Sequence, residues 1–382
     1  MSGEWRVAAT RHSPFANPQG TEVFERQNVA DMAGYVPGAQ PDGLVVAKLN
    51  TNENPYPPAP AVMAALGAIE ADALRRYPDP MARGFRAAAA RLHGVTPDHV
   101  IATNGGDELL RLAFTTFVDP GGVVGLAEPS YSLYPVLAAI QGSRLCHVPL
   151  EADWSLAPGM AARWNEAGAQ LAILVNPHAP SGRLATADEI AAIAQAFTGV
   201  LLVDEAYVDF VDPERGHDLS PLVRSLPNVL LLRTMSKGYS LAGLRFAYGV
   251  GAPGLIAPML TKTKDSYNVD AISQTLAAVA LDQRTHAAAG WARIRAERGR
   301  LAAALGARGF ASAASQTNFL LVDVPASVTG GARALHRRLQ DAGIFVRWFD
   351  QDRLRQRLRI TIGTPDENTA LMAAIDRLTA PD

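Results

Sequence analysis

The most regular feature of the chain is a series of short, unbroken apolar runs, each bounded by polar residues or glycine. The runs at 171–175 (LAILV), 200–203 (VLLV) and 229–232 (VLLL) have the length and uniform apolar character of buried strands. Between the first two, the sequence TADE at 186–189 is a capping box that opens a helix, which Gly199 ends. Strands that are apolar on both faces and alternate with helices predict a parallel sheet covered on both sides.

This pattern also occurs upstream, and it changes in the last third of the chain. Runs at 100–103 and 123–126 predict two more strands, whereas the first 45 residues are polar and irregular. Beyond about residue 270 we expect helices at 284–306, at 331–341 and from about 366, with strands at 318–322, 344–348 and 358–362. The chain is therefore expected to form an N-terminal arm (1–45) that packs with the small domain, a large α/β domain (46–270) and a small C-terminal α+β domain (271–382).

Composition and charge narrow the class of protein. The 382 residues are 48% hydrophobic and 19% charged, which supports sizeable cores, and the net charge of −2 gives no reason to expect nucleic acid or a membrane as a partner. No stretch approaches the roughly 18 apolar residues of a membrane span, and the N-terminus lacks the apolar core of a signal peptide. The single cysteine, Cys146, fits a reducing compartment. We expect a cytoplasmic protein.

Polar residues follow several of the apolar runs at the point where each strand ends. Asn176, Asp204 and Lys237 follow the runs at 171–175, 200–203 and 229–232, and the glycine turn at 105–106 and Tyr131 follow two other strands. Ligands bind outside the carboxyl ends of the strands in open α/β folds. These residues are therefore expected to converge on one crevice.

Lys237 lies in the segment RTMSKGYSLAGLR at 233–245. Burial disfavours an ammonium ion, so a lysine at the end of a buried strand becomes a better nucleophile toward carbonyl compounds. Ser236 and Arg245 offer a hydroxyl and a guanidinium group, which suit a phosphate. An amine nucleophile beside a phosphate site indicates pyridoxal phosphate (PLP). Taken alone, the segment also fits a surface lysine on an ordinary loop.

The remaining requirements of PLP each have a candidate. Asp204 supplies the buried carboxylate that keeps the pyridine nitrogen protonated. The backbone of Gly106 and Asp107 adds phosphate donors at a helix N-terminus, and Asn176 and Tyr207 can donate to the ring oxygen. Once released, the lysine can also move a proton as general acid and base. Tyr131 either stacks on the ring or packs in the core.

Competing chemistries fit the sequence poorly. The residues at 249–254 match G-x-G-x-x-G, but a proline lies within the motif and no acidic residue follows about 20 positions later, so a dinucleotide site is not indicated. The eight histidines show no metal-ligand spacing, and we expect no metal. Asp204 and Glu205 are adjacent on a strand and point to opposite faces, which excludes a catalytic carboxylate pair.

Taken together, these segments resemble the fold-type I, PLP-dependent aminotransferases of class I/II, and within them the branch that acts on histidinol phosphate. The resemblance covers nearly the whole chain, in segments that keep the order and spacing of the family: 48–58 (KLNTNENPYPP), 76–80 (RYPDP), 104–108 (NGGDE), 128–134 (EPSYSLY), 176–182 (NPHAPSG), 203–210 (VDEAYVDF), 233–245, 265–274 (DSYNVDAISQ) and 358–368 (LRITIGTPDEN). The chain departs from the family at 176–182, where the usual loop is closer to N-P-N-N-P-T-G. It also has Gly106 where serine is common, which leaves that contact to the backbone.

The resemblance implies a large domain built on a mostly parallel seven-stranded sheet. It also implies a homodimer with shared active sites, in which Tyr77 reaches the phosphate of the neighbouring subunit's PLP and Tyr131 stacks on the ring. Arg359 would hold the substrate α-carboxylate, while Arg347 and Tyr35 help to bind a substrate phosphate. The expected substrate-binding residues are Tyr35, Asn176, Tyr267, Arg347 and Arg359.

The implied reaction converts L-histidinol phosphate and 2-oxoglutarate into imidazole acetol phosphate and L-glutamate in histidine biosynthesis. Two guanidinium groups, those of Arg347 and Arg359, favour a phosphorylated substrate, although either arginine could instead lie on the solvent face of its strand. Three alternatives stay open. They are an aromatic amino acid aminotransferase, which would need only Arg359, a threonine-phosphate decarboxylase, and a PLP-binding module without catalytic activity.

Overall fold

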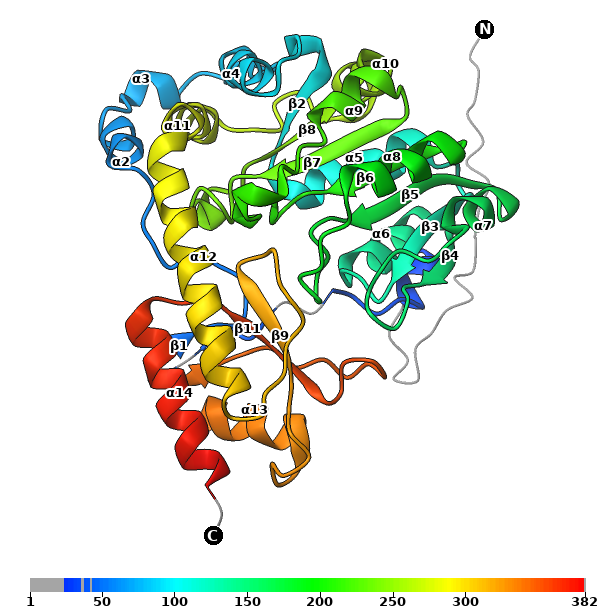
Figure 1. The fold of residues 1–382 in the computed structure, drawn as a ribbon. Helices are drawn as coiled ribbons and strands as arrows, with labels where there is room; N and C mark the ends of the chain where they lie inside the picture. Colours follow the sequence, from blue (N-terminus) through cyan, green and yellow to red (C-terminus); the bar gives the residue numbers. More distant parts are fainter. Residues whose placement is uncertain (1–23, 36–37, 42, 381–382) are drawn as a thin grey trace, which may run out of the picture.

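The computed structural model describes residues 24–35, 38–41 and 43–380 (Figure 1). Its centre is a seven-stranded sheet with the order β2-β8-β7-β6-β5-β3-β4. The strands are β2 (Val100–Thr103), β3 (Val123–Glu128), β4 (Arg144–Pro149), β5 (Ala169–Val175), β6 (Val200–Asp204), β7 (Val229–Thr234) and β8 (Ala247–Gly251). Only β8 runs antiparallel to its neighbours, so the expected mostly parallel seven-stranded sheet is confirmed.

Apolar residues on both faces of each strand hold the sheet between two layers of helices. On β7, Leu230 and Leu232 belong to one buried cluster, while Val229 and Leu231 belong to the other. The first cluster includes residues of α5 (Gly105–Phe117), α6 (Leu133–Gln141) and α10 (Pro253–Pro258). The second includes residues of α4 (Arg83–His93), α7 (Met160–Glu166), α8 (Ala187–Ala196) and α9 (Ser220–Ser225). The predicted capping box of α8 is present, since Thr186 and Glu189 bond reciprocally.

The G-x-G-x-x-G match proves to be part of the sheet. Gly249 and Gly251 lie in β8, a strand that the apolar pattern did not reveal. A Cβ atom on Gly249 would lie 3.0 Å from Ile101 and 3.1 Å from Leu109. Glycine is needed here because α5 packs closely against the sheet, and not because a nucleotide approaches.

The C-terminal part of the chain forms two small sheets flanked by helices. The elements are α11 (Ala271–Asp282), α12 (Arg284–Gly306), β9 (Phe319–Asp323), α13 (Gly331–Asp341), β10 (Ile344–Phe345), β11 (Arg357–Thr361) and α14 (Pro365–Thr379). Strands β9 and β11 pair antiparallel, and β10 pairs parallel with β1 (Ala47–Lys48). The strand expected at 344–348 is shorter, and Arg347 forms an isolated bridge to Arg359. Helix α12 extends from the region of the large sheet to the C-terminal part (Figure 1).

The N-terminal part includes three short helices, α1 (Gln27–Ala30), α2 (Pro60–Gly67) and α3 (Ala71–Leu74). Helix α1 lies against α6, where Asn28 donates a hydrogen bond to the Ala139 carbonyl (2.7 Å), a contact that the sequence did not predict. Most of the arm expected at 1–45, namely 1–23, 36–37 and 42, lies outside the described residues. The pairing of β1 with β10 joins residues 47–48 to the C-terminal part, and the division at 45 and 270 stays a prediction.

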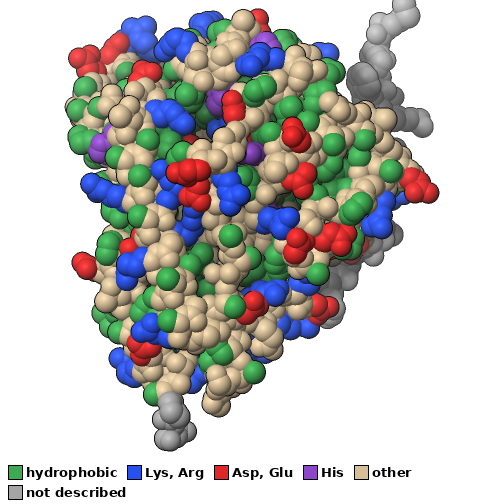
Figure 2. Space-filling view, in the orientation of Figure 1, with side chains coloured by type: hydrophobic (Ala, Val, Ile, Leu, Met, Phe, Trp, Pro, Cys, Tyr) green, Lys and Arg blue, Asp and Glu red, His purple; other side chains and the backbone are tan. Residues whose placement is uncertain are grey.

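The face of the molecule shown in Figure 2 has no large area of one charge. In Figure 2, basic and acidic side chains are interspersed over the visible face. Within the described ranges, no helix combines the length and the apolar character needed to cross a bilayer.

Candidate active site

A cavity of about 310 Å³ opens at the carboxyl ends of β5, β6 and β7, between the large sheet and the C-terminal part. It is large enough for a small-molecule site. The structure brings together at this cavity most of the residues predicted from the sequence: Tyr35, Gly106, Asp107, Tyr131, Asp204, Tyr207, Ser236, Lys237, Arg245, Arg347 and Arg359. The convergence predicted for residues that follow strands is therefore confirmed for Gly106, Tyr131, Asp204 and Lys237.

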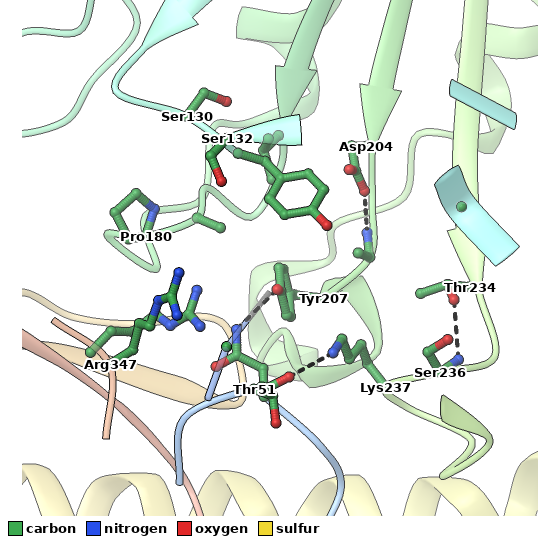
Figure 3. Close-up of a pocket in the computed structure, with 18 of the residues that line it drawn as sticks. Thr51, Ser130, Ser132, Pro180, Asp204, Tyr207, Thr234, Ser236, Lys237 and Arg347 are labelled. Atoms are coloured by element: carbon green, nitrogen blue, oxygen red, sulfur yellow. Dashed lines mark hydrogen bonds between the residues drawn. The ribbon is translucent and has the colours of Figure 1, made fainter. Parts of the chain in front are cut away.

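Lys237 follows β7 and extends its amine into the cavity (Figure 3). The amine donates a hydrogen bond to the Thr51 carbonyl at 2.9 Å. Burial, together with the positive charge of Arg359, lowers the pKa of Lys237 to about 8, and Glu53 opposes this shift. A larger fraction of the amine is therefore uncharged near neutral pH than in an exposed lysine, which is the property that a nucleophilic lysine needs.

Asp204 ends β6 and is 6% exposed. Its carboxylate accepts a hydrogen bond from the Tyr134 hydroxyl (2.7 Å) and another from the Ala206 backbone N–H (3.0 Å). Burial raises the pKa of Asp204 to about 6, although both hydrogen bonds act to lower it. A cation placed in the cavity beside this carboxylate would remove the penalty of burying its charge.

The N-terminus of α5 and the side chain of Arg245 form the end of the cavity that suits an anion. Gly106 and Asp107 lie in the first turn of α5, where backbone N–H groups are unpaired. Arg245 lies 3.6 Å from the Asp107 carboxylate and donates to the Ser236 hydroxyl at 3.4 Å. Gly105, the first residue of the predicted glycine turn, has φ +75°, and a Cβ atom there would lie 2.7 Å from the Arg245 guanidinium. A glycine at 105 is therefore what allows Arg245 to reach this helix end.

Two arginines line the opposite wall. Arg347 and Arg359 are held side by side because each backbone N–H donates to the carbonyl of the other, at 3.0 and 2.8 Å. Arg359 also donates to the Asn50 carbonyl at 2.9 Å, and its buried Nε has no hydrogen-bond partner among the described residues. A buried unpaired donor of this kind is costly unless a ligand accepts from it.

Two tyrosines complete this part of the site. The rings of Tyr35 and Tyr131 meet edge to face at 5.7 Å, and Tyr131 has the same arrangement with Tyr134 at 5.5 Å. Tyr131 therefore has two aromatic neighbours and still lines the cavity.

Asn176 is a predicted site residue that the structure places outside the lining of this cavity. Its amide donates to the Ala185 carbonyl (3.1 Å) and accepts from the Ala185 N–H (2.8 Å), which closes the loop after β5. The reason is the pleat of the strands. Val175 pairs with Asp204 and lines the cavity with it, so the next residue, Asn176, points to the other face. From the same loop, Ala179 lines the cavity instead.

Tyr77 and Tyr267 also lie outside the cavity of the single chain. Their rings stack on each other at 4.4 Å on the surface, where Tyr77 is 80% exposed and Tyr267 is 46% exposed.

The residues of the site that the sequence did not single out include Asn52, Thr51 and Tyr134. The polar cluster at 50–54 and the three-residue spacing of Tyr131 and Tyr134 were the available signals. No group of three or more His, Cys, Asp or Glu in the described part could hold a metal ion.

Comparison with known proteins identifies the family. The family described as aminotransferase class I and II matches residues 45–375. The chain belongs to this family. A relative from Trichormus variabilis, named histidinol-phosphate aminotransferase 1, is 41% identical over 353 residues, which are 92% of this chain and 98% of the relative. A histidinol-phosphate aminotransferase from Rhodopirellula baltica is 40% identical over 92% of this chain and 95% of its own.

A solved structure supports the same assignment. The histidinol-phosphate aminotransferase from Sinorhizobium meliloti, in complex with pyridoxal-5′-phosphate, superposes with a TM-score of 0.85 and 29% identity over 94% of this chain and 99% of that one. The structure of aspartate aminotransferase tetra mutant 1 from Thermus thermophilus, at 21% identity and a TM-score of 0.75, shares the fold, which is that of fold-type I aminotransferases.

The electrostatics of Lys237 predict a testable pH dependence. In protein freed of cofactor, modification of Lys237 by an amine-reactive reagent, followed by peptide mass spectrometry, should rise with a midpoint near pH 8. The Arg359 cation lowers this pKa and the Glu53 carboxylate raises it, so Arg359→Met should move the midpoint up and Glu53→Gln should move it down. A midpoint near the ordinary lysine value of 10.5, or shifts of the same sign in both variants, would contradict this account of the site.

Proposed function

We propose that the protein is a PLP-dependent aminotransferase that converts L-histidinol phosphate and 2-oxoglutarate into imidazole acetol phosphate and L-glutamate, in the biosynthesis of histidine. The observation that carries the proposal is the set of residues that line one cavity. A buried lysine amine, a buried carboxylate, a helix N-terminus with an arginine, and a pair of adjacent arginines all line it. Each group answers a different requirement of cofactor or substrate, and a chance grouping would not meet them together.

The residues of the cavity fit PLP. Lys237 would bond to the carbonyl carbon of the cofactor, and Asp204 would pair with the protonated ring nitrogen, which supplies the cation that this buried carboxylate lacks. The first turn of α5, Ser236 and Arg245 would hold the phosphate. When bound, PLP supplies a carbonyl group that takes over the amino group and a ring that accepts the electron pair left at the substrate Cα.

The chain itself binds, orients and moves protons. The amine of Lys237, which has a pKa of about 8, would take the proton from the substrate Cα and deliver it to the former carbonyl carbon of the cofactor. Tyr207 lies beside Lys237 and Asp204 in the cavity wall and would donate its hydroxyl proton to the ring oxygen. Tyr131, in edge-to-face contact with Tyr35 and with Tyr134, would stack on the ring.

The two arginines support a phosphorylated substrate. L-Histidinol phosphate carries a phosphate and no α-carboxylate, whereas glutamate carries two carboxylates. Arg359 would therefore serve the anionic group of either substrate, and Arg347 with Tyr35 would add the contacts that a dianionic phosphate needs. The relatives from Trichormus variabilis and Rhodopirellula baltica are named histidinol-phosphate aminotransferases, which supports the same substrate.

We further propose that the protein acts as a homodimer with shared sites. Tyr77 and Tyr267 form an exposed aromatic pair, and the exposed side chains of Met63, Leu66 and Leu74 lie on the neighbouring helices α2 and α3. An exposed apolar surface of this kind is typical of an interface. In a dimer, Tyr77 would reach the phosphate of the neighbouring subunit's PLP and Tyr267 would border the same site. The cytoplasmic location stays a prediction.

The substrate is tested by following loss of the yellow cofactor absorbance in purified protein without keto acid. We expect fast loss with L-histidinol phosphate and slow loss with L-phenylalanine or L-threonine phosphate. Arg347→Met should lower the second-order rate constant of this half-reaction with histidinol phosphate by about 10- to 100-fold, because a charge-assisted contact of about 1.5–3 kcal/mol is lost. The same variant should react with phenylalanine almost unchanged, whereas Arg359→Met should impair both substrates.

The other outcomes are informative. Faster reaction with phenylalanine would indicate an aromatic aminotransferase, and release of CO₂ from threonine phosphate would indicate a decarboxylase. If the yellow protein formed but reacted with no amine, a cofactor-binding module without catalytic activity would be the better reading. A protein that never bound PLP would contradict the proposal as a whole.

The shared site is tested by mixing two inactive variants. Lys237→Ala removes the amine, and Tyr77→Ala removes the residue expected to cross the interface. After co-expression, mixed dimers contain one site with both native residues, so activity should return to as much as about half per dimer, because one of the two sites is intact. No recovery in isolated mixed dimers would show that Tyr77 does not act across the interface.

A further inference from the structure

Asn52 is held in an unusual position on the edge of the cavity. It lies in the loop after β1, is 1% exposed, and has a left-handed backbone with φ +55°, which is uncommon for residues other than glycine. Four hydrogen bonds fix it there. Its backbone N–H donates to the Thr361 hydroxyl (3.0 Å), its carbonyl accepts from the Asn318 amide (2.9 Å), and its side chain bonds to the hydroxyls of Thr361 and Tyr207.

The hydrogen bonds around Thr361 determine which way the Asn52 amide faces. The Thr361 oxygen accepts from the Asn52 backbone N–H, so the threonine proton needs an acceptor, and the Asn52 Oδ1 atom lies 3.0 Å away. If the amide were reversed, the Thr361 oxygen would face two donors, and its own proton would have no acceptor among the contacts of the described residues. An unsatisfied hydroxyl at this buried position, where Thr361 is 2% exposed, would be costly.

This orientation places the Asn52 Nδ2 atom against Tyr207. The amide donates to the Tyr207 oxygen at 3.0 Å, and the tyrosine ring is held edge to face on Phe319 at 5.1 Å. The proton of a phenol cannot point at an N–H group that is itself donating. The Tyr207 proton must therefore point elsewhere, and on the cavity side, which Tyr207 lines, it would meet the ring oxygen of a bound cofactor.

We propose that Asn52 and Thr361 are positioning residues that turn Tyr207 into an obligate hydrogen-bond donor toward the cavity. Thr361 lies in β11 of the C-terminal part and does not line the cavity, so it acts through Asn52 alone. The contact of Asn318, which precedes β9, strengthens the same link. The direction of the Tyr207 proton is thus set by residues that are distant in sequence: Asn52 lies 155 positions from Tyr207, and Thr361 lies 309 positions from Asn52. This inference rests on the proposed function, since it assumes PLP in the cavity.

The test measures the apparent pKa of the bound cofactor's absorbance by titration of the purified holoprotein, without any substrate. A hydrogen bond donated to the ring oxygen stabilises the oxygen's anionic form, and this lowers the pH at which the bound chromophore loses its proton. Thr361→Val removes the hydroxyl that orients the Asn52 side-chain amide, so we expect the apparent pKa of the chromophore to rise by about half to one unit. Thr361→Ser keeps the hydroxyl and should titrate like the native protein.

A second variant covers the case in which Thr361→Val does not fold. Asn52→Asp tolerates the left-handed backbone and offers only acceptors to Tyr207, so the tyrosine proton should turn toward the new carboxylate and the apparent pKa should rise by about one unit or more. Part of that rise comes from the added charge. The same substitution in a Tyr207→Phe background measures that part, and the remainder reports on the Tyr207 proton. Thr361→Val should have no effect on the titration in that background.

The outcomes separate the two proposals. A native protein that binds no PLP and shows no yellow absorbance would overturn the proposed function. A native protein that is yellow, with Thr361→Val and Asn52→Asp titrating at the native pKa, would leave the proposed function intact and overturn the role of Asn52 and Thr361. Equal shifts with and without Tyr207 would also overturn it, because they would show that the effect does not pass through the tyrosine.

Discussion

The pairing register of β5, β6 and β7 is the constraint on which the rest of the site depends. Val175, Asp204 and Leu232 pair across the three strands and all face the cavity. Because side chains alternate along a strand, a shift of one residue would exchange every group that faces the ligand for its neighbour. Asp204 would then be replaced by Glu205, which in the observed register does not line the cavity and accepts a hydrogen bond from Arg233 (2.6 Å).

That alternation also explains what could and could not be predicted from the sequence. The parallel sheet, the capping box of α8, and the helices at 284–306 and 331–341 followed from patterns a few residues long. The convergence of Lys237, Asp204 and Tyr131 followed from their positions after strands. Asn176 also follows a strand, but the choice of face depends on the register with the next strand, and one sequence does not reveal it. Strand β8 was missed because its glycines mask the apolar pattern.

The site itself holds features that oppose stability. Lys237 and Arg359 are neighbouring cations in a buried position, and Asp204 is a buried carboxylate with no ion-pair partner among the described residues. Asn52 and Arg245 both have a positive φ, at 55° and 58°. Strained or uncompensated groups of this kind collect where a ligand relieves them, so a cofactor that carries both a cation and anions would stabilise the native protein.

The central claim is that Lys237, at the end of β7, is the residue that carries the cofactor. The most direct measurement is to fix PLP to the native holoprotein with borohydride and to map the modified peptide by mass spectrometry. The account predicts a single modified lysine, Lys237, with the label absent from a Lys237→Arg variant treated in the same way. A label on another lysine, such as Lys48 or Lys264, would contradict the account of the site.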